Sequence, residues 1–279
     1  MGVKTIIHTF HGNVFQGYFS PRKTQFFINL EKMLALCSTK IIAISQLQKE
    51  ELLNFKITKE SKLEIVKLGF DFSNVIPEKS YKTDFRKRFN IEENDILVGI
   101  VGRLAPIKNH EMFVDIAEIV LKSIKTNIKF VIIGDGEVKQ NIEAYIKEKG
   151  LQEYFIFTGF TNNLKEIYSE IDYITLTSKN EGTPVAIIEA MANKKLIFST
   201  NVGGISDFVD NNKTGYYFGK DDVIGFAAKL TEVIKHHNTD RYNKIKEDAS
   251  KVAIEQFSYK RLVKDIDELY SKLITRGKK

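Results

Sequence analysis

Two glutamates at the spacing Glu181-x7-Glu189 lie in a stretch that combines carboxylates, a tight turn and the start of a helix. The stretch reads Asn180-Glu-Gly-Thr-Pro-Val-Ala-Ile-Ile-Glu-Ala-Met-Ala192. Carboxylates beside a phosphate site do not bind the phosphate, because like charges repel, but they accept hydrogen bonds from the hydroxyls of a sugar or a ribose. Glutamates near a helix start also occur for capping reasons alone, so the motif by itself leaves a functional and a structural interpretation open.

The helix start within this stretch is typical of an anion site. Residues 173–178 are β-branched and aromatic, which predicts a strand, and the residues after Pro184 favour a helix. Pro184 suits the first helical position, where its missing N–H costs nothing. The free N–H groups of Thr183, Val185 and Ala186 would then point out of the helix N-terminus, where the helix dipole favours phosphate oxygens.

Two cations follow another predicted strand. Residues 96–102 form a near-continuous apolar run, which is typical of a parallel strand covered on both faces. Gly102-Arg103 and Lys108 come after it, so both cations lie at the carboxyl edge of the sheet, where Glu181 also lies. The planar guanidinium of Arg103 and the compact charge of Lys108 are suited to bind a diphosphate. The alternative interpretation is that both are solvated surface cations without a binding role.

Alternation of strands and helices after residue 76 predicts an α/β fold with a doubly wound parallel sheet and right-handed crossovers. Gly134-Asp-Gly136 and Gly203-Gly204 also fall at strand ends. Gly134-Asp-Gly136 lacks the third glycine of a dinucleotide fingerprint, which disfavours a hydride-transfer enzyme. A diphosphate clamp together with carboxylates for hydroxyls indicates a nucleotide sugar as the ligand.

The composition is that of a globular protein. The chain has 279 residues, 43% of them hydrophobic, enough for one or two domains. Its formal net charge of +6 suits anionic ligands, but scattered lysines without an aromatic-basic platform disfavour nucleic acid. Cys37 is the only cysteine, which fits a reducing, cytoplasmic setting. Zinc-type Cys/His spacing is absent, as is an apolar run of the ~20 residues needed to cross a bilayer.

The first 75 residues predict a smaller unit with strands at residues 5–12, 39–45 and 62–69, followed by a linker at residues 71–82. His8 and His11 lie at the carboxyl end of the first strand, where ligands bind in open α/β sheets. We prefer His11 as a site residue, whereas His8 is no better than a core or loop histidine.

A helix is predicted at residues 21–38. Its apolar residues recur at helical spacing: Phe26, Phe27, Leu30, Met33, Leu34 and Cys37. This pattern predicts a core-facing helix with a solvated basic edge. In a less favoured interpretation, its phenylalanines and lysines enter an anionic membrane surface.

Five motifs together resemble the nucleotide-sugar domain of the family 4 retaining glycosyltransferases, the group 1 glycosyl transferases of GT-B fold. They are Gly102-Arg103 with Lys108, Gly134-Asp-Gly136, Phe157-Thr-Gly-Phe160, Glu181-x7-Glu189 and Gly203-Gly204. The resemblance covers most of the chain. It implies a partial Rossmann-like acceptor-side domain at residues 1–75, a Rossmann-like nucleotide-sugar domain at residues 76–257, and a last helix at residues 258–279 that packs back towards the first domain.

The resemblance also implies roles for individual residues. Arg103 and Lys108 would bind the donor diphosphate, Glu181 would lie by the donor sugar, Glu189 would take the ribose hydroxyls, and His11 would face the reacting centre. The other implied donor-binding residues are Gly182, Thr183, Pro184 and Val185 at the distal phosphate, with Gly102, Gly134 and Phe160 around the rest of the donor. No metal ion or other cofactor is implied.

The expected activity is transfer of a sugar from a nucleotide-sugar donor to an acceptor hydroxyl with retention, in cell-surface polysaccharide or glycolipid synthesis. The acceptor would be a sugar, a lipid-linked sugar or a polysaccharide, and the protein cytoplasmic with peripheral contact to the inner face of the membrane. Family members begin with a further segment, so residues 1–75 match only the second half of the acceptor domain. Two alternatives stay open: a truncated, non-catalytic nucleotide-sugar-binding module, and a nucleotide-sugar epimerase of similar fold.

Overall fold

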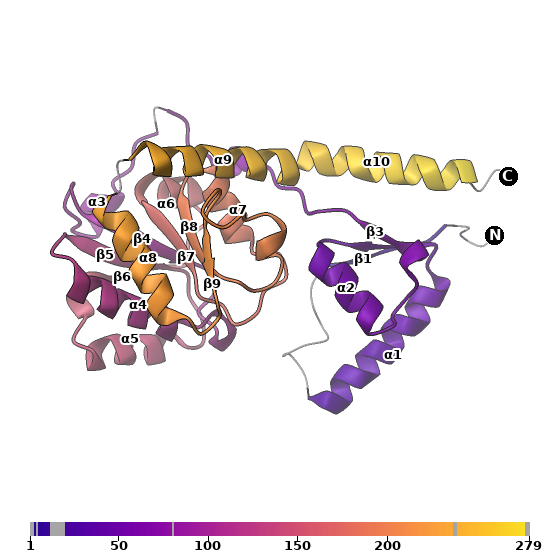
Figure 1. Cartoon of the computed structure of the whole chain (residues 1–279), viewed down its shortest axis with the longest axis horizontal. Helices are drawn as coiled ribbons and strands as arrows, with labels where there is room; N and C mark the ends of the chain where they lie inside the picture. The colour runs from indigo at the N-terminus through magenta and orange to yellow at the C-terminus, as the bar shows by residue number, and fades with distance from the viewer. Residues whose placement is uncertain (1–2, 4, 12–19, 80, 237–238, 277–279) are drawn as a thin grey trace.

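The computed structural model describes residues 3, 5–11, 20–79, 81–236 and 239–276. Figure 1 shows two α/β units, a larger one and a smaller one, with a pair of long helices at the C-terminal end of the chain running along both.

Six parallel strands form the sheet of the larger unit, in the order β6-β5-β4-β7-β8-β9. They are β4 (Ile96–Val101), β5 (Ile128–Ile133), β6 (Phe155–Gly159), β7 (Tyr173–Leu176), β8 (Leu196–Thr200) and β9 (Tyr216–Phe218). The chain runs outward from β4 through β5 to β6 and then returns to the other side of β4 with β7. The predicted doubly wound parallel sheet is therefore confirmed, with its reversal between β4 and β7.

Helices cover both faces of this sheet. They are α3 (Phe85–Arg88), α4 (His110–Ser123), α5 (Lys139–Glu148), α6 (Leu164–Glu170), α7 (Val185–Ala192), α8 (Val223–Lys235) and α9 (Asp240–Phe257). Because side chains alternate along a strand, Val98 and Ile100 pack with α4, α5 and α8, while Leu97 packs with α6, α7 and α9. Each face of the sheet thus has its own apolar core, as the continuous apolar run in β4 predicts.

The smaller unit is built on three parallel strands in the order β1-β2-β3. They are β1 (Ile7–Phe10), β2 (Lys40–Ala43) and β3 (Leu63–Ile65), and the helices beside them are α1 (Pro21–Cys37) and α2 (Gln46–Asn54). Ser45 is the N-cap of α2, and its hydroxyl accepts a hydrogen bond from the N–H of Gln48.

The face that α1 buries differs from the predicted one. Ile28 and Ala35 pack on the small sheet, whereas the side chains of Phe26 (64% exposed), Met33 and Leu34 lie exposed, as does Cys37. Apolar residues occur nearly all round this helix, so the spacing of its largest residues could not identify the buried face. The prediction that Phe26, Met33, Leu34 and Cys37 face the core was wrong.

The last helix, α10 (Tyr259–Arg276), lies over the smaller unit (Figure 1). Leu269 and Leu273 share an apolar cluster with Ile42 and Val66. The chain therefore crosses between the units twice, first after β3 and again between α9 and α10. Phe70 and the α9–α10 junction are joined at this crossing: the N–H of Phe70 donates to Phe257 O (2.7 Å), and the N–H of Tyr259 donates to Phe70 O (3.0 Å).

The packing also places the break between the units earlier than the predicted position after residue 75. Phe72 and Val75 belong to the apolar cluster of the larger unit, while Val66 belongs to that of the smaller one. The break therefore lies between these residues, near Gly69.

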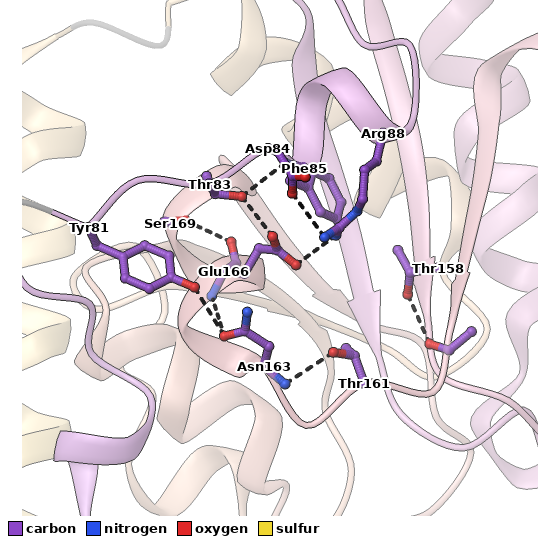
Figure 2. Close-up of polar contacts among 11 residues, drawn as sticks. Tyr81, Thr83, Asp84, Phe85, Arg88, Thr158, Thr161, Asn163, Glu166 and Ser169 are labelled. Atoms are coloured by element: carbon purple, nitrogen blue, oxygen red, sulfur yellow. Dashed lines mark hydrogen bonds and ion pairs between the residues drawn. The ribbon is translucent and has the colours of Figure 1, made fainter.

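Polar contacts fasten the segment before α3 to helix α6 (Figure 2). The buried carboxylate of Glu166 accepts hydrogen bonds from Thr83 Oγ1 (2.8 Å) and Arg88 Nη2 (2.8 Å). The Tyr81 hydroxyl lies 3.1 Å from Asn163 Oδ1, and Asn163 is the N-cap of α6. Because both oxygens of Glu166 are paired, α6 is held firmly at the edge of the candidate site described below.

Candidate active site

The carboxyl ends of β4 and β7 lie side by side at the point where the strand order reverses. In an open α/β sheet this switch point leaves a crevice in which ligands bind. Gly102 and Arg103 follow β4 directly, and the loop that carries Glu181 follows β7. Cations and carboxylates that are far apart in the sequence therefore meet at one edge of the sheet.

Backbone contacts hold the two loops together. A short 3₁₀ turn (Pro106–Lys108) follows β4, and the N–H of Lys179 donates to Ile107 O in it (2.8 Å). The buried Thr177 hydroxyl lies 3.1 Å from Lys108 O and 3.0 Å from Asn109 O. These bonds place the backbone of Lys108 next to the residues that lead to Glu181.

Lys108 and Glu181 form an ion pair in this crevice. Lys108 Nζ lies 2.6 Å from Glu181 Oε1, and the hydroxyl of Ser178 donates to the same oxygen at 2.6 Å. Both charged side chains are largely shielded from solvent, which strengthens a charge-assisted hydrogen bond relative to one on an open surface. Ser178 was not identified from the sequence, although it belongs to the predicted strand that precedes Glu181.

Helix α7 begins at Val185, one residue later than predicted, because Pro184 has an extended ψ of 95° and is the N-cap residue. The N-terminus of α7 thus opens directly after Gly182 and Thr183, in the loop that carries Glu181. The carbonyl of Gly182 accepts a hydrogen bond from the N–H of Gly204 (2.9 Å). Gly203-Gly204, which follows β8, therefore packs against the loop that carries Glu181 and helps to hold it in place.

Gly102, Arg103, Gly134 and Phe160 line one cavity of about 530 Å³, with Leu164 of α6 at its wall. Gly134 has to be glycine, since a Cβ atom there would lie 2.0 Å from Gly102 O. The Phe160 side chain is 75% exposed and is available to stack on a planar ring. This cavity is mostly apolar and has the size of a small-molecule site.

Arg103 is not part of the Lys108–Glu181 pair. Its guanidinium points to Glu137, with Nη2 3.0 Å from Glu137 Oε2, and both side chains are well exposed. An exposed ion pair of this kind contributes about 0–1 kcal/mol, so Arg103 can exchange Glu137 for a ligand phosphate at little cost.

Glu189 lies on α7 and is half-buried. Burial raises the pKa of Glu189, which the hydrogen bond from the Tyr168 hydroxyl to Glu189 Oε2 (3.0 Å) opposes. Tyr168 was not predicted to belong to the site. Its signal in the sequence, one aromatic residue in a short helix, is no different from that of a core residue.

His11 lies exposed just after β1, and the structure records no contact between it and Lys108 or Glu181. The residues that follow it, 12–19, lie outside those that the structure describes. His8 stacks on Phe10 with 4.7 Å between ring centroids, as expected for a histidine with a structural role.

His110, the first residue of α4, is a buried titratable group that the sequence did not single out. It is 3% exposed, and neither of its ring nitrogens has a hydrogen-bond partner in the described part of the chain. Burial, with a smaller contribution from the charge of Lys108, lowers the pKa of His110 to about 4. The imidazole is therefore neutral at pH 7 and does not compete with Lys108 for Glu181.

Acid should destabilise the chain through His110. The unfolded chain protonates this histidine near pH 6.5 and the folded chain only near pH 4, so the stabilisation is complete above pH 6.5 and is lost between these values. From pH 7.5 to pH 5, the wild type should lose about 2 kcal/mol more unfolding free energy than His110→Leu. Urea titrations at both pH values test this, and equal losses in the two proteins would contradict it.

In the ranges that the structure describes, no group of three or more His, Cys, Asp or Glu side chains is placed to hold a metal ion. None of the helices there combines the length and the apolar character needed to cross a bilayer. The expectation of a metal-independent site stays a prediction.

The family model described as "Glycosyl transferases group 1" matches residues 81–252. The chain therefore belongs to the group 1 glycosyl transferases. It is 27% identical to an Escherichia coli UDP-Gal:alpha-D-GlcNAc-diphosphoundecaprenol alpha-1,3-galactosyltransferase, over 83% of this chain and 60% of that protein. A Campylobacter jejuni alpha-1,4-N-acetyl-D-galactosaminyltransferase acting on a diNAcBac-PP-undecaprenol glycan is 33% identical over 66% of this chain and 49% of its own length.

Among solved structures, Anabaena HepE in complex with UDP superposes with a TM-score of 0.84 over 96% of this chain and 72% of that one, at 19% identity. HepE has also been solved in complex with UDP-glucose. A likeness at this identity shows the fold, and it confirms the predicted GT-B class. The chain spans about half to three fifths of the length of the two curated relatives.

Proposed function

We propose that this chain is the donor-binding part of a retaining glycosyltransferase, which transfers a sugar from a nucleotide sugar to an acceptor hydroxyl. The observation that carries the proposal is the Lys108–Glu181 pair at the switch point, in the loop that opens the N-terminus of α7. One crevice thus offers a cation and free N–H groups for a diphosphate, and a carboxylate for the hydroxyls of a sugar.

Catalysis would come mainly from stabilising the negative charge on the departing diphosphate. Lys108 is already fixed by its carboxylate partner, and the α7 N-terminus adds N–H donors at Thr183 and Val185. Arg103 would leave Glu137 and close on the diphosphate as a planar fork. Because these groups stabilise the leaving diphosphate by charge and hydrogen bonds, the proposed mechanism does not require a side chain that acts as a covalent nucleophile.

The nucleoside would occupy the cavity beside this crevice. Phe160 and the backbone at Gly134 would flank the base, and Glu189 would accept from the ribose hydroxyls. We infer a uridine donor, since one relative is named for UDP-Gal and HepE was solved with UDP and with UDP-glucose.

The acceptor proposed is a lipid-linked or polysaccharide glycan. Both curated relatives are named for undecaprenol-linked substrates. The exposed side chain of Phe26 on α1, together with the exposed basic residues Arg22 and Lys23 within about one helical turn of it, suits contact with an anionic membrane surface. We therefore propose a cytoplasmic protein that works at the inner face of the membrane.

Thermal unfolding in the presence of UDP, GDP and ADP and their sugar conjugates tests the donor site. A ligand at a hundred times its dissociation constant should add about 2.7 kcal/mol to the unfolding free energy. We expect stabilisation by the uridine forms, and its loss in Glu189→Ala, because that change removes the ribose acceptor. No stabilisation by any nucleotide would overturn the donor site.

Product analysis separates the remaining interpretations. A glycosyltransferase forms a new glycoside only when an acceptor is supplied. A nucleotide-sugar epimerase changes the donor sugar without an acceptor, and a binding module takes up the donor without changing it. Either of the latter results would overturn the proposed transfer reaction while leaving the donor site in place.

A further inference from the structure

Tyr168 is a buried tyrosine whose hydroxyl reaches the candidate ribose site. It lies on α6, is 1% exposed, and is within hydrogen-bond distance of two acceptors on α7: Glu189 Oε2 at 3.0 Å and Ala186 O at 3.2 Å. Nothing in the proposed transfer reaction uses this hydroxyl. It is, however, the only donor to the Glu189 carboxylate among the residues that the structure describes.

We propose that Tyr168 is a positioning residue that holds the Glu189 carboxylate in the orientation that selects ribose over deoxyribose in the donor nucleotide. The inference rests on the proposed function, because it assigns a specificity device to the same donor site.

The single hydroxyl proton of Tyr168 decides which carboxylate oxygen is available to a ligand. A phenol has one proton to donate, and the charged, nearer Oε2 is the stronger of its two acceptors. One lone pair of Oε2 is then used, and Oε1 is the oxygen that keeps both lone pairs for a ligand. One carboxylate oxygen has two lone pairs, which suits the two neighbouring hydroxyls of a ribose. A deoxyribose would leave this half-buried oxygen short of a donor.

The position of Tyr168 is itself fixed, which a positioning role requires. Glu166, two residues earlier on α6, is buried and has both oxygens paired, with Thr83 and with Arg88 (Figure 2). Leu164, one turn before Tyr168, lines the cavity proposed for the base. One short, anchored helix therefore contributes both to the base cavity and to the ribose acceptor.

Equilibrium binding of UDP, 2′-deoxy-UDP and 3′-deoxy-UDP to the whole chain tests the inference without requiring turnover. The wild type should prefer UDP by about tenfold or more over each deoxy form, as expected for a hydrogen bond to a charged group. Tyr168→Phe, which removes one oxygen atom, should lose most of this preference by weakening UDP far more than the deoxy forms. In the double variant Tyr168→Phe/Glu189→Gln, the preference for UDP over the deoxy forms should be no smaller than in Glu189→Gln alone, because the tyrosine acts through the glutamate.

Tyr216→Phe is the matched control. Tyr216 is equally buried, and its hydroxyl has no partner in the described part of the chain, so this variant should keep the wild-type preference. If Tyr168→Phe weakens UDP and the deoxy forms by the same factor, the tyrosine has only a structural role and the inference is overturned. A wild type that binds UDP and both deoxy forms equally also overturns it, but leaves the diphosphate site intact. Absence of nucleotide binding overturns the proposed function as well.

Discussion

Replacing Lys108 with alanine should lower sugar transfer by about 10²- to 10³-fold, the usual effect of removing one preorganised donor from a developing negative charge. The ammonium group is already held 2.6 Å from Glu181 beside the α7 N-terminus, so no other described cation is equally well placed to replace it. The chain should stay folded, since Lys108 belongs to neither apolar core and Ser178 still donates to Glu181. Initial rates and a melting curve of the same preparation measure both effects.

Lys122→Ala is the control for loss of a lysine. Lys122 also pairs with a glutamate, Glu118, but on the exposed outer side of α4. Its replacement should leave transfer unchanged. Near-normal transfer by Lys108→Ala would show that the lysine does not stabilise the leaving diphosphate, and would remove the main catalytic assignment.

Gly203→Ala should lower transfer by about 10²-fold although Gly203 carries no side chain to contact a substrate. A Cβ atom at this position would lie 2.4 Å from Glu181 O and 2.5 Å from Gly182 O, so the loop that carries Glu181 has to move away. A displacement of about 1 Å at a reacting centre is enough for a loss of this size. Rates, UDP affinity and melting temperature should all fall.

Gly150→Ala separates this contact from backbone strain. Gly150 has a φ of +70°, close to the +57° of Gly203, but no atom lies within 4 Å of the Cβ position. Alanine at either position is forced into the left-handed region, at a cost of about 1–3 kcal/mol. Only the Gly203 variant should lose transfer. Equal losses in both variants would mean that general destabilisation, and not displacement of Glu181, causes the defect.

The larger sheet could be predicted because its strands are covered on both faces. The continuous apolar run of β4 (Ile96–Val101) marks such a strand from composition alone. β9 (Tyr216–Phe218) was not predicted, since a strand of three residues shows no period. α6 was missed because a seven-residue helix has too few apolar positions to show a helical pattern.

The sequence could predict which strand ends carry candidate residues, but not the contacts that the side chains make. Lys108 and Glu181 were identified because each follows a strand at the carboxyl edge, yet only the adjacency of β4 and β7 brings them into contact. Arg103 was placed with them on the same reasoning, and its side chain turns to Glu137 instead. Side-chain direction in a loop depends on tertiary neighbours, which no local pattern specifies. The same holds for Tyr168, whose hydroxyl meets α7 only in the folded chain.

The two chain crossings near Phe70 and Ser258 determine how the two units can move relative to each other. They lie next to each other and are joined by two backbone hydrogen bonds, so they behave as one narrow strap. Arg261 reinforces it through contacts of its guanidinium with the carbonyls of Lys67 and Leu68. Close to this strap, the carboxylate of Asp207 accepts a hydrogen bond from the N–H of Gln46 at the start of α2 (2.9 Å), and the neighbouring Phe208 packs against Phe257. Because the strap and this contact lie together, the two units are joined at one place, and a rotation there would change the separation between the smaller unit and the carboxyl edge of the larger sheet.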